Sequence, residues 1–380
     1  MARVALVCEP PDGGVAEHVA LLALGLAERG YEPLVFGPPD FALRARLAGR
    51  FRALPLGREY GRPDRDAAAA AALARALRAT GCDLVHAHAA KAGVLGRLAA
   101  VAAGAPAVYT PHCLPFVGEV SAARRRFGLF AERSLAPLTA ALVCVCEQER
   151  RVALAARLRP RRLVVVHNGC PAPDPRQVTD PALRELKRRG PLVGAVSVLR
   201  RQKAVDVLLD AMPALRARVP DARVAIVGDG PERAALLSRA APLGDAVAFL
   251  PFTPPAARHL LELDVYVLPS AWEAFPIGVL EAQACGIPQV ATDVGGTREA
   301  VVPDTGVLVP PRDPGALAAA LAELLLDPGR RARLAAASLA RHAERFSVER
   351  MLDGTAAVYD AVLRAPAAAA RRRAAPPAGR

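Results

Sequence analysis

Two glutamates eight positions apart are the strongest candidates for chemistry. Glu273 lies on a loop after a strand expected at Val265–Leu268, and Glu281 lies in a helix expected to begin near Gly278. The two carboxylates can therefore face one site from different elements. A carboxylate accepts two hydrogen bonds at once, which suits sugar or ribose hydroxyls, and the helix N-terminus between them favours an anion. The alternative is two unrelated surface glutamates.

A basic run follows the strand expected at Leu192–Val196. Arg200, Arg201 and Lys203 place three cations at the carboxyl end of that strand, where ligands bind in open α/β sheets. Cations at this position suit a pyrophosphate. The alternative for so short a cluster is the solvated start of a helix.

Two glycine-containing turns are candidates for phosphate binding. Gly13 and Gly14 lie between the first strand and the first helix, and Gly228 and Gly230 lie in a second strand-to-helix turn. Glycine lets backbone amides approach an anion closely, and the helix N-terminus adds about half a positive charge. Neither turn is a complete G-x-G-x-x-G motif. The turn at Gly13 and Gly14 is therefore equally consistent with a tight turn that binds nothing. The turn at Gly228 and Gly230, taken alone, indicates only a tight turn.

No set of metal ligands is evident, and we expect no metal and no cofactor. Asp64 and Asp66 precede an alanine-rich helix, where aspartate is a favoured cap. His86 and His88 lie two positions apart at a strand end and point alike, but no third ligand is evident, which favours packing or the lining of an acceptor site. The seven cysteines include no C-x-x-C pair, so neither a disulfide framework nor a thiolate zinc site is expected.

The order of elements predicts an α/β protein. At about 150 residues per domain, 380 residues allow two or three domains. Short β-branched runs alternate with segments of helical period, which indicates parallel βα units on both sides of a proline-rich stretch at 167–175. The expected strands are Val4–Val7, Pro33–Phe36, Leu84–His86, Ala107–Thr110, Ala141–Val145 and Leu163–Val166, then Leu192–Val196, Val224–Val227, Ala246–Phe249, Val265–Leu268, Gln289–Ala291 and Gly306–Val309. We therefore expect Rossmann-like domains at 1–170 and 171–345, a helix at 346–363 and a disordered basic tail at 364–380.

Net charge and hydropathy limit the classes of binding partner that the sequence suggests. The net charge is +13, and the tail from Arg364 contributes five arginines and no acid. Arg124–Arg126 precede Phe127 and Phe130, a basic amphipathic pattern that suits an anionic membrane surface. The alternative is a helix with one buried and one solvated face. Nucleic acid is not expected, because no aromatic platform accompanies the arginines. Without a signal peptide or an 18-residue apolar span, we expect a cytoplasmic protein, at most peripheral at the inner face of the membrane.

The ordered set of motifs resembles the family 4 retaining glycosyltransferases (glycosyl transferases group 1), which have the GT-B fold. The resemblance runs from about residue 2 to residue 360. The motifs that carry it are Gly13–His18, Tyr109–His112, Val166–Gly169, the Lys203 segment, Val227–Pro231, Glu273 with Glu281 and the following Ala282–Pro288, Val294–Glu299 and Gly306–Pro311.

The resemblance implies a fold and a set of roles. Two Rossmann-like domains would face each other across a cleft, the first binding the acceptor and the second the donor, with the final helix returning to the first. Glu273, His112 and Lys203 would be catalytic, with Glu273 and His112 near the transferred sugar. The implied donor-binding set is Gly13, Gly14, Arg200, Arg201, Lys203, Gly228, Gly230, Glu273, Phe275, Pro276, Ile277, Gly278, Val279 and Glu281.

The resemblance also implies an activity. A sugar would move, with retention and without a metal, from a UDP- or GDP-sugar to a hydroxyl of a glycan, glycolipid or lipid-linked acceptor. A nucleotide-sugar 2-epimerase of the same architecture and a non-catalytic sugar-nucleotide-binding subunit are the alternatives. The sequence departs from the family at Ala204 and Ala274, where glycine is usual, and at Val198 or Ser197, where a basic residue is usual. Arg200 or Arg201 would then replace that missing charge.

Overall fold

The chain divides into two compact units. The computed structural model describes residues 1–47, 49–57 and 62–374. Unit 1 consists of Met1–His167 together with Glu349–Arg380, and unit 2 consists of Asn168–Val348. The expected boundaries at 170 and 345 each lie three residues from the observed ones.

Unit 1 is built on a parallel sheet. Within the described residues it has seven strands in the order β3-β2-β1-β4-β5-β6-β7. Their bounds are β1 Ala2–Cys8, β2 Tyr31–Gly37, β3 Phe51–Ala53, β4 Leu84–His88, β5 Ala107–Thr110, β6 Thr139–Cys144 and β7 Leu163–Val165. The six expected strands are present, and β3 is an addition. Sequence patterning missed β3 because this edge strand has only three residues and a charged Arg52 at its centre.

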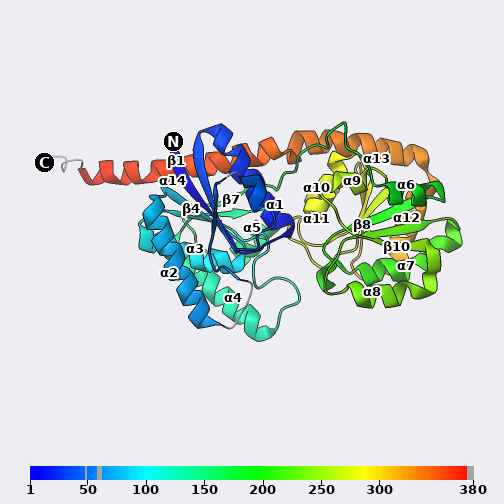
Figure 1. Ribbon diagram of the computed structural model, residues 1–380, viewed down its shortest axis with the longest axis horizontal. Helices are drawn as coiled ribbons and strands as arrows, with labels where there is room; N and C mark the ends of the chain where they lie inside the picture. The colour runs from blue at the N-terminus through cyan, green and yellow to red at the C-terminus, as the bar shows by residue number, and fades with distance from the viewer. Residues whose placement is uncertain (48, 58–61, 375–380) are drawn as a thin grey trace. The chain divides into compact units, whose positions relative to one another are not determined.

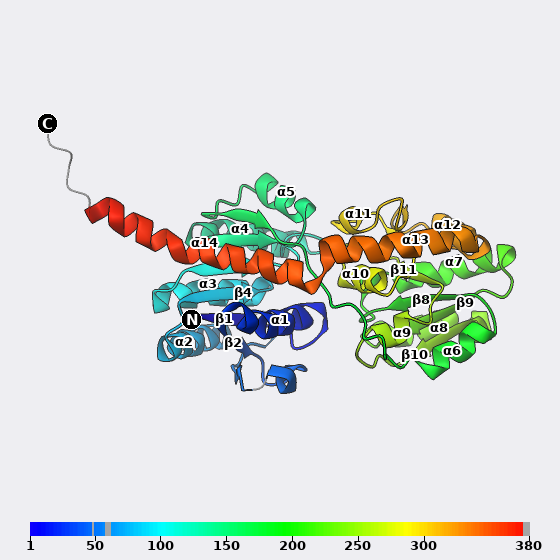
Figure 2. The same ribbon diagram turned by 90° about the horizontal axis from the view of Figure 1, so that it is seen from above.

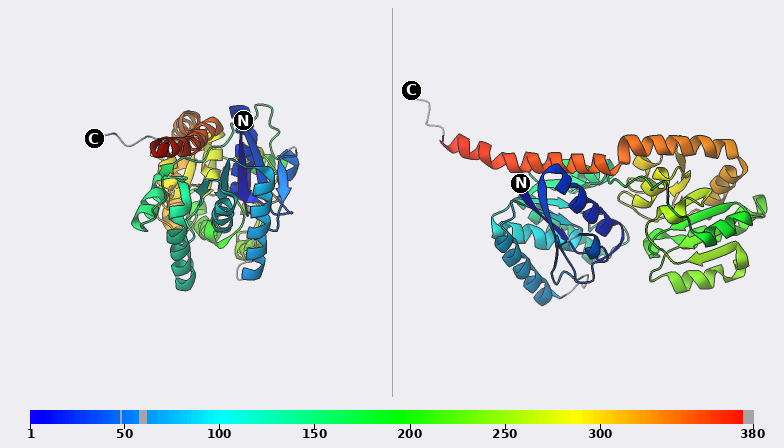
Figure 3. Two further views of the ribbon diagram at one scale, coloured as in Figure 1. Left: turned by 90° about the vertical axis from the view of Figure 1, so that its left-hand side faces the viewer. Right: turned by 45° about the horizontal axis from the view of Figure 1, so that its top comes forward.

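Helices cover both faces of the unit 1 sheet. They are α1 Gly13–Gly25, α2 Pro63–Thr80, α3 Ala90–Ala103, α4 Ala122–Leu135, α5 Glu147–Ala155 and α14 Val348–Ala374. A Cβ at Gly96 of α3 would lie 2.8 Å from the Cβ of Ala87, so α3 packs directly on that face of β4. Neighbouring residues of a strand point to opposite faces of the sheet. His86 therefore points to the face opposite α3, where it contacts Tyr359 of α14. Figures 1 and 3 show α14 and α2 on opposite sides of the sheet.

The last helix is longer than predicted. It continues to Ala374, eleven residues beyond the expected end at Leu363. The structure draws residues 364–374 as part of this helix, where the sequence predicts a disordered tail, and residues 375–380 lie outside the described part of the chain. The segment is rich in alanine and arginine, which are strong helix formers, so the helix that begins at Val348 is propagated through it.

Unit 2 repeats the same architecture. Its described residues form a parallel sheet of six strands in the order β10-β9-β8-β11-β12-β13. The strands are β8 Leu192–Val196, β9 Arg223–Val227, β10 Val247–Leu250, β11 Val265–Leu268, β12 Gln289–Thr292 and β13 Gly306–Val309. All match strands expected from the sequence, and the predicted α/β class with two Rossmann-like halves is confirmed.

The helices of unit 2 form two layers. They are α6 Pro181–Arg188, α7 Val205–Arg218, α8 Arg233–Ala240, α9 Ala257–Leu260, α10 Ile277–Ala284, α11 Thr297–Ala300, α12 Pro314–Leu326 and α13 Pro328–Arg341. Residues of α7, α8 and α12 pack with Val193 and Val265 on one face of the sheet. On the other face, α10 approaches so closely that a Cβ at Gly278 would lie 2.4 Å from the Tyr266 hydroxyl. Figure 2 shows α10 beside β11 and α13.

Candidate functional site

The Glu273 carboxylate is the centre of a hydrogen-bonded group at the carboxyl end of β11. Its Oε1 accepts from Lys203 Nζ at 2.6 Å and from Ser270 Oγ at 2.8 Å. Its Oε2 accepts from Gln202 Nε2 at 3.3 Å. Glu273 is 8% exposed, while the Lys203 side chain keeps 23% of its surface accessible. The structure therefore brings together a fixed carboxylate and a partly accessible cation that lie seventy positions apart in the sequence.

Backbone geometry places Lys203 beside the carboxylate. Lys203 ends a short 3-10 turn, and Ala204 follows it in the left-handed conformation with φ of 45°. This conformation costs a residue other than glycine about 1–2 kcal/mol, which explains why glycine is usual at this position. The Ala271 amide donates to the Gln202 carbonyl at 2.8 Å and ties the two loops together.

The glycines near this group serve close packing of the backbone. A Cβ at Gly228 would lie 2.0 Å from the Ser197 carbonyl oxygen, and one at Gly230 would lie 2.4 Å from that of Leu199. At Gly295, whose φ is 53°, a Cβ would lie 1.9 Å from the carbonyl oxygen of Glu273. These glycines let neighbouring turns hold the two loops in place. Arg200 and Arg201 lie exposed on the first of these loops.

Glu281 lies in the second turn of α10 and is half-buried. Burial, together with the negative charge of Glu281, raises the pKa of Tyr266 and that of the Cys170 thiol, and it raises the pKa of Cys285 to about 12. These neighbours therefore stay neutral at physiological pH. Around Glu281, Tyr266 keeps its hydroxyl proton as a hydrogen-bond donor.

The predicted donor-binding residues between the two glutamates are buried or half-buried. Phe275 is 4% exposed and its ring lies 5.5 Å from that of Phe346. Asn168 Nδ2 donates to the Phe275 carbonyl at 3.2 Å, and Val279 is completely buried. Their side chains belong to the core of unit 2. Pro276, Ile277 and Gly278 form the start of α10, where Pro276 is the N-cap and is buried, and the other two are half-buried.

The unit 1 candidates lie at the carboxyl edge of its sheet. Gly13 and Gly14 are exposed and begin α1. Gly13 has a φ of 78°, with no atom within 4 Å of an added Cβ. His112 follows β5 and also has a positive φ, 57°. A positive φ is uncommon outside glycine and marks strained positions at functional sites.

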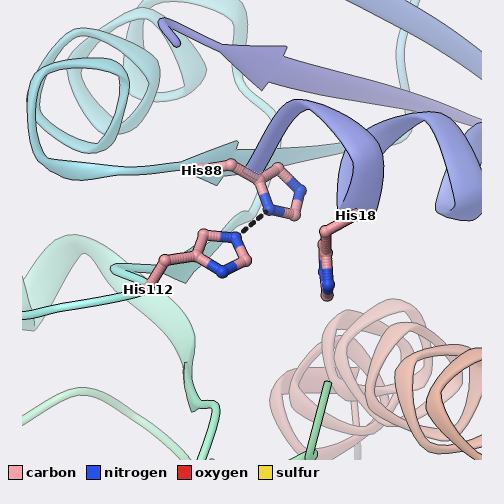
Figure 4. Close-up of side chains that lie close together, drawn as sticks. All are labelled: His18, His88 and His112. Carbon is pink, nitrogen blue, oxygen red and sulfur yellow. Dashed lines mark hydrogen bonds between the residues drawn. The ribbon is translucent and has the colours of Figure 1, made fainter. Parts of the chain in front are cut away.

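His112 belongs to a cluster of three imidazoles. His18 comes from α1, His88 from the end of β4 and His112 from the loop after β5 (Figure 4). The His88 Nδ1 and His112 Nε2 atoms lie 3.1 Å apart and share a hydrogen bond. Burial and the neighbouring imidazoles hold the pKa of His88 and His112 well below the usual value. Both rings are therefore neutral at physiological pH.

The sequence shows no third partner for the His86 and His88 pair, but the fold supplies two further histidines beside His88. His86 packs at the strand end, where its two nitrogens bond to the Tyr359 hydroxyl at 2.6 Å and to Thr110 Oγ1 at 2.8 Å. His88 instead meets His18 and His112. These three histidines lie at or beyond the carboxyl ends of β1, β4 and β5, which are adjacent in the sheet, so only the strand order reveals the cluster.

The Asp64 and Asp66 pair plays a different part from the expected cap. The N-cap of α2 is Arg62, and both aspartates lie in the first turn, where negative charge complements the helix dipole. Asp64 pairs with Arg62 at 3.3 Å, and Asp66 pairs with Lys91 at 2.7 Å. Gln202 and Ser270, by contrast, were not singled out, because their residue types carry no signal without the fold.

Comparisons with known proteins agree with this architecture. The family model described as Glycosyltransferase Family 4 matches residues 12–172, and that of Glycosyl transferases group 1 matches residues 190–327. The chain is 38% identical over 322 residues to a D-inositol 3-phosphate glycosyltransferase of Salinispora tropica, covering 75% of this chain and 65% of that relative. It is 32% identical to the protein of that name in Geodermatophilus obscurus, covering 95% of this chain and 87% of the relative.

Solved structures show the same fold. Anabaena HepE in complex with UDP and glucose superposes with a TM-score of 0.81 at 23% identity, covering 95% of this chain and all of that one. Sucrose-phosphate synthase from Thermosynechococcus elongatus gives 0.82 at 23% identity, covering 96% of this chain and all of that one. The two Rossmann-like domains are thus of the GT-B type. The chain belongs to glycosyltransferase family 4 and is a glycosyltransferase, as its motifs predicted.

Proposed function

We propose that this glycosyltransferase moves a sugar, with retention, from a UDP- or GDP-sugar to a hydroxyl of a glycan, glycolipid or lipid-linked acceptor. The observation that carries the proposal is the contact of 2.6 Å between Lys203 Nζ and Glu273 Oε1 at the carboxyl edge of the unit 2 sheet. At that edge, the Lys203 ammonium, which suits a diphosphate, lies beside the Glu273 carboxylate, which suits sugar hydroxyls. Ligands of open α/β sheets bind at that edge.

In the proposed reaction, negative charge develops on the diphosphate as the bond to the sugar breaks. Lys203, with Arg200 or Arg201, stabilises that charge. Because Glu273 already holds the ammonium in position, little reorganisation is needed in the transition state. The acceptor hydroxyl attacks on the face from which the diphosphate leaves and gives its proton to that diphosphate, so no strong protein base is required.

The remaining assignments follow the family pattern. We propose that Glu281 accepts hydrogen bonds from the donor ribose, His112 contacts the transferred sugar, and the Gly13–Gly14 amides contact a phosphate. The relatives are named D-inositol 3-phosphate glycosyltransferases. D-inositol 3-phosphate is therefore the first acceptor to test.

The donor nucleotide is tested by thermal unfolding of the wild type and the Glu281→Ala variant with UDP, GDP, ADP and dTDP. A ligand at about 100 times its dissociation constant adds about 2.7 kcal/mol to stability. One nucleotide is expected to raise the Tm of the wild type, and the variant is expected to lose this shift with the ribose contact. Glu323→Ala, an exposed position of unit 2, is the control and should keep the shift. No shift with any nucleotide, or equal shifts in all three proteins, would contradict the assignment.

We propose that transfer needs no divalent metal, because lysine and arginine supply the positive charge at the diphosphate. The Asp64 and Asp66 pair, the one Asp-x-Asp of the sequence, is engaged by Arg62 and Lys91. EDTA is expected not to lower the initial rate of transfer. Loss of activity in EDTA, with recovery on adding Mn²⁺, would refute metal independence.

We propose a peripheral contact between α4 and an anionic membrane at the cytoplasmic face. Phe127 and Phe130 are 71% and 69% exposed, and Arg124–Arg126 lie exposed in the preceding turn. None of the described helices is long and apolar enough to cross a membrane. Vesicles of phosphatidylglycerol should bind the protein and those of phosphatidylcholine should not, while Phe127→Ser with Phe130→Ser should weaken binding. Equal binding of the wild type to both vesicles would contradict this contact.

A further inference from the structure

The three imidazoles of His18, His88 and His112 are arranged as ligands of one ion. Each offers a nitrogen within 4.8 Å of the nitrogens of the other two. The ring centroids are 4.6 Å apart for His18 and His112, 5.4 Å for His88 and His112, and 5.5 Å for His18 and His88. In Figure 4 the rings surround a common space, each approaching from a different element.

The spacing is close to that of a tetrahedral zinc site. Zinc binds imidazole nitrogens at about 2.0–2.1 Å, so two bound nitrogens lie about 3.4 Å apart. The His88 Nδ1 and His112 Nε2 atoms are already 3.1 Å apart. No pair of these nitrogens is more than 4.8 Å apart, so each pair needs to close by at most about 1.4 Å to reach the zinc spacing.

A second observation comes from His88 itself. Its side chain is completely buried, and its Nε2 has no hydrogen-bond partner among the described residues. A buried polar atom without a partner costs about 1–3 kcal/mol, so the described part of the protein alone does not satisfy the His88 ring, whose other nitrogen, Nδ1, faces His112. His86, two residues earlier, differs because both of its nitrogens are hydrogen-bonded to protein groups.

We propose that His18, His88 and His112 bind one Zn²⁺ through an imidazole nitrogen of each, with the fourth position open to water or an anion. Three imidazoles without a carboxylate favour Zn²⁺ over Mg²⁺ or Mn²⁺, which prefer oxygen ligands. The site goes beyond the proposed transfer reaction and differs from any role of metal at the diphosphate. Since the ion occupies His112, bound Zn²⁺ inhibits transfer, and EDTA reverses the inhibition.

Metal binding is measured on the full chain after removal of metals, without donor or acceptor. Calorimetry with Zn²⁺ is expected to give one site per chain, and Co²⁺ is expected to give the visible absorption of a tetrahedral nitrogen site. His18→Ala and His112→Ala each remove one of the three ligands. Each should weaken the affinity for Zn²⁺ by more than roughly 10–100-fold, which is the loss caused by removing a residue that only hydrogen-bonds to a metal ligand. His259→Gln, a buried histidine of unit 2, should leave the affinity unchanged.

The outcomes separate this proposal from the transfer reaction. No site by calorimetry and no Co²⁺ absorption would overturn it, as would full affinity in both His18→Ala and His112→Ala. Thermal melts of each variant establish that it is folded, and the partly exposed His112 provides the variant that perturbs the core least. Because the readout needs no nucleotide, a negative result here leaves the nucleotide-dependent melt of the wild type and Glu281→Ala as an independent test of transfer.

Discussion

Replacing Lys203 by alanine is expected to lower the rate of sugar transfer by about 10²–10³-fold, the usual cost of losing one preorganised group that stabilises transition-state charge. Lys203 Nζ is held 2.6 Å from Glu273 and remains partly accessible, so it is fixed before the donor arrives. In the variant, Glu273 keeps its hydrogen bonds from Ser270 and Gln202. Initial rates at varied donor concentration give the loss, which should fall mainly on kcat.

Lys187→Ala is the matched control for this experiment. Lys187 belongs to the same unit and pairs with Asp264 at 3.3 Å, but its side chain is 38% exposed and lies on α6, not on the Lys203 turn. Its removal should change the rate by less than about twofold, since exposed ion pairs contribute about 0–1 kcal/mol. If Lys203→Ala transferred sugar at a rate close to that of Lys187→Ala, the diphosphate role of Lys203 would be wrong.

Arg97→Ala is expected to destabilise the protein by about 3–5 kcal/mol, the cost of leaving a buried charge without its partner. Arg97 on α3 and Glu132 on α4 are each 1% exposed and form two parallel hydrogen bonds of 2.9 and 3.1 Å. The guanidinium also donates to the Gly93 carbonyl at 2.7 Å and lies 4.1 Å from the centre of the Tyr109 ring. Urea unfolding followed by circular dichroism measures the loss.

Two further variants make this test specific. Arg239→Ala removes an arginine from an exposed pair with Asp210 and should cost about 0–1 kcal/mol. Arg97→Met combined with Glu132→Leu removes both charges and should recover most of the stability lost in Arg97→Ala, because apolar residues of similar volume replace buried ion pairs well. Equal unfolding midpoints for Arg97→Ala and Arg239→Ala would show that the buried pair is not a major contributor.

The fold was predictable from the sequence because buried parallel strands are continuous apolar runs. Twelve of the strands in the described residues were expected, and β3 alone among them was not. An edge strand of three residues has too few positions to establish a pattern. The extension of α14 to Ala374 was missed for another reason: a charged segment rich in alanine suits both a tail and a helix.

The candidate site was predictable only in part. Lys203 and Glu273 follow strands β8 and β11, which are neighbours in the sheet, so their meeting follows from Rossmann topology. The histidine cluster required the order of three strands. Arg97 and Glu132 have the residue types of a solvated helix face, and nothing in their spacing separates a buried pair of charges from an exposed one.

The division of unit 1 into two segments has a consequence for synthesis on the ribosome. Tyr31 and His86 on the sheet are hydrogen-bonded to Asp360 and Tyr359, and a Cβ at Gly25 would collide with Leu352, so α14 completes that face. All of Asn168–Val348 is translated between the two segments. Unit 2 therefore has its whole sequence available before unit 1 does. Until α14 is synthesised, the part of the unit 1 sheet that α14 covers stays exposed to solvent.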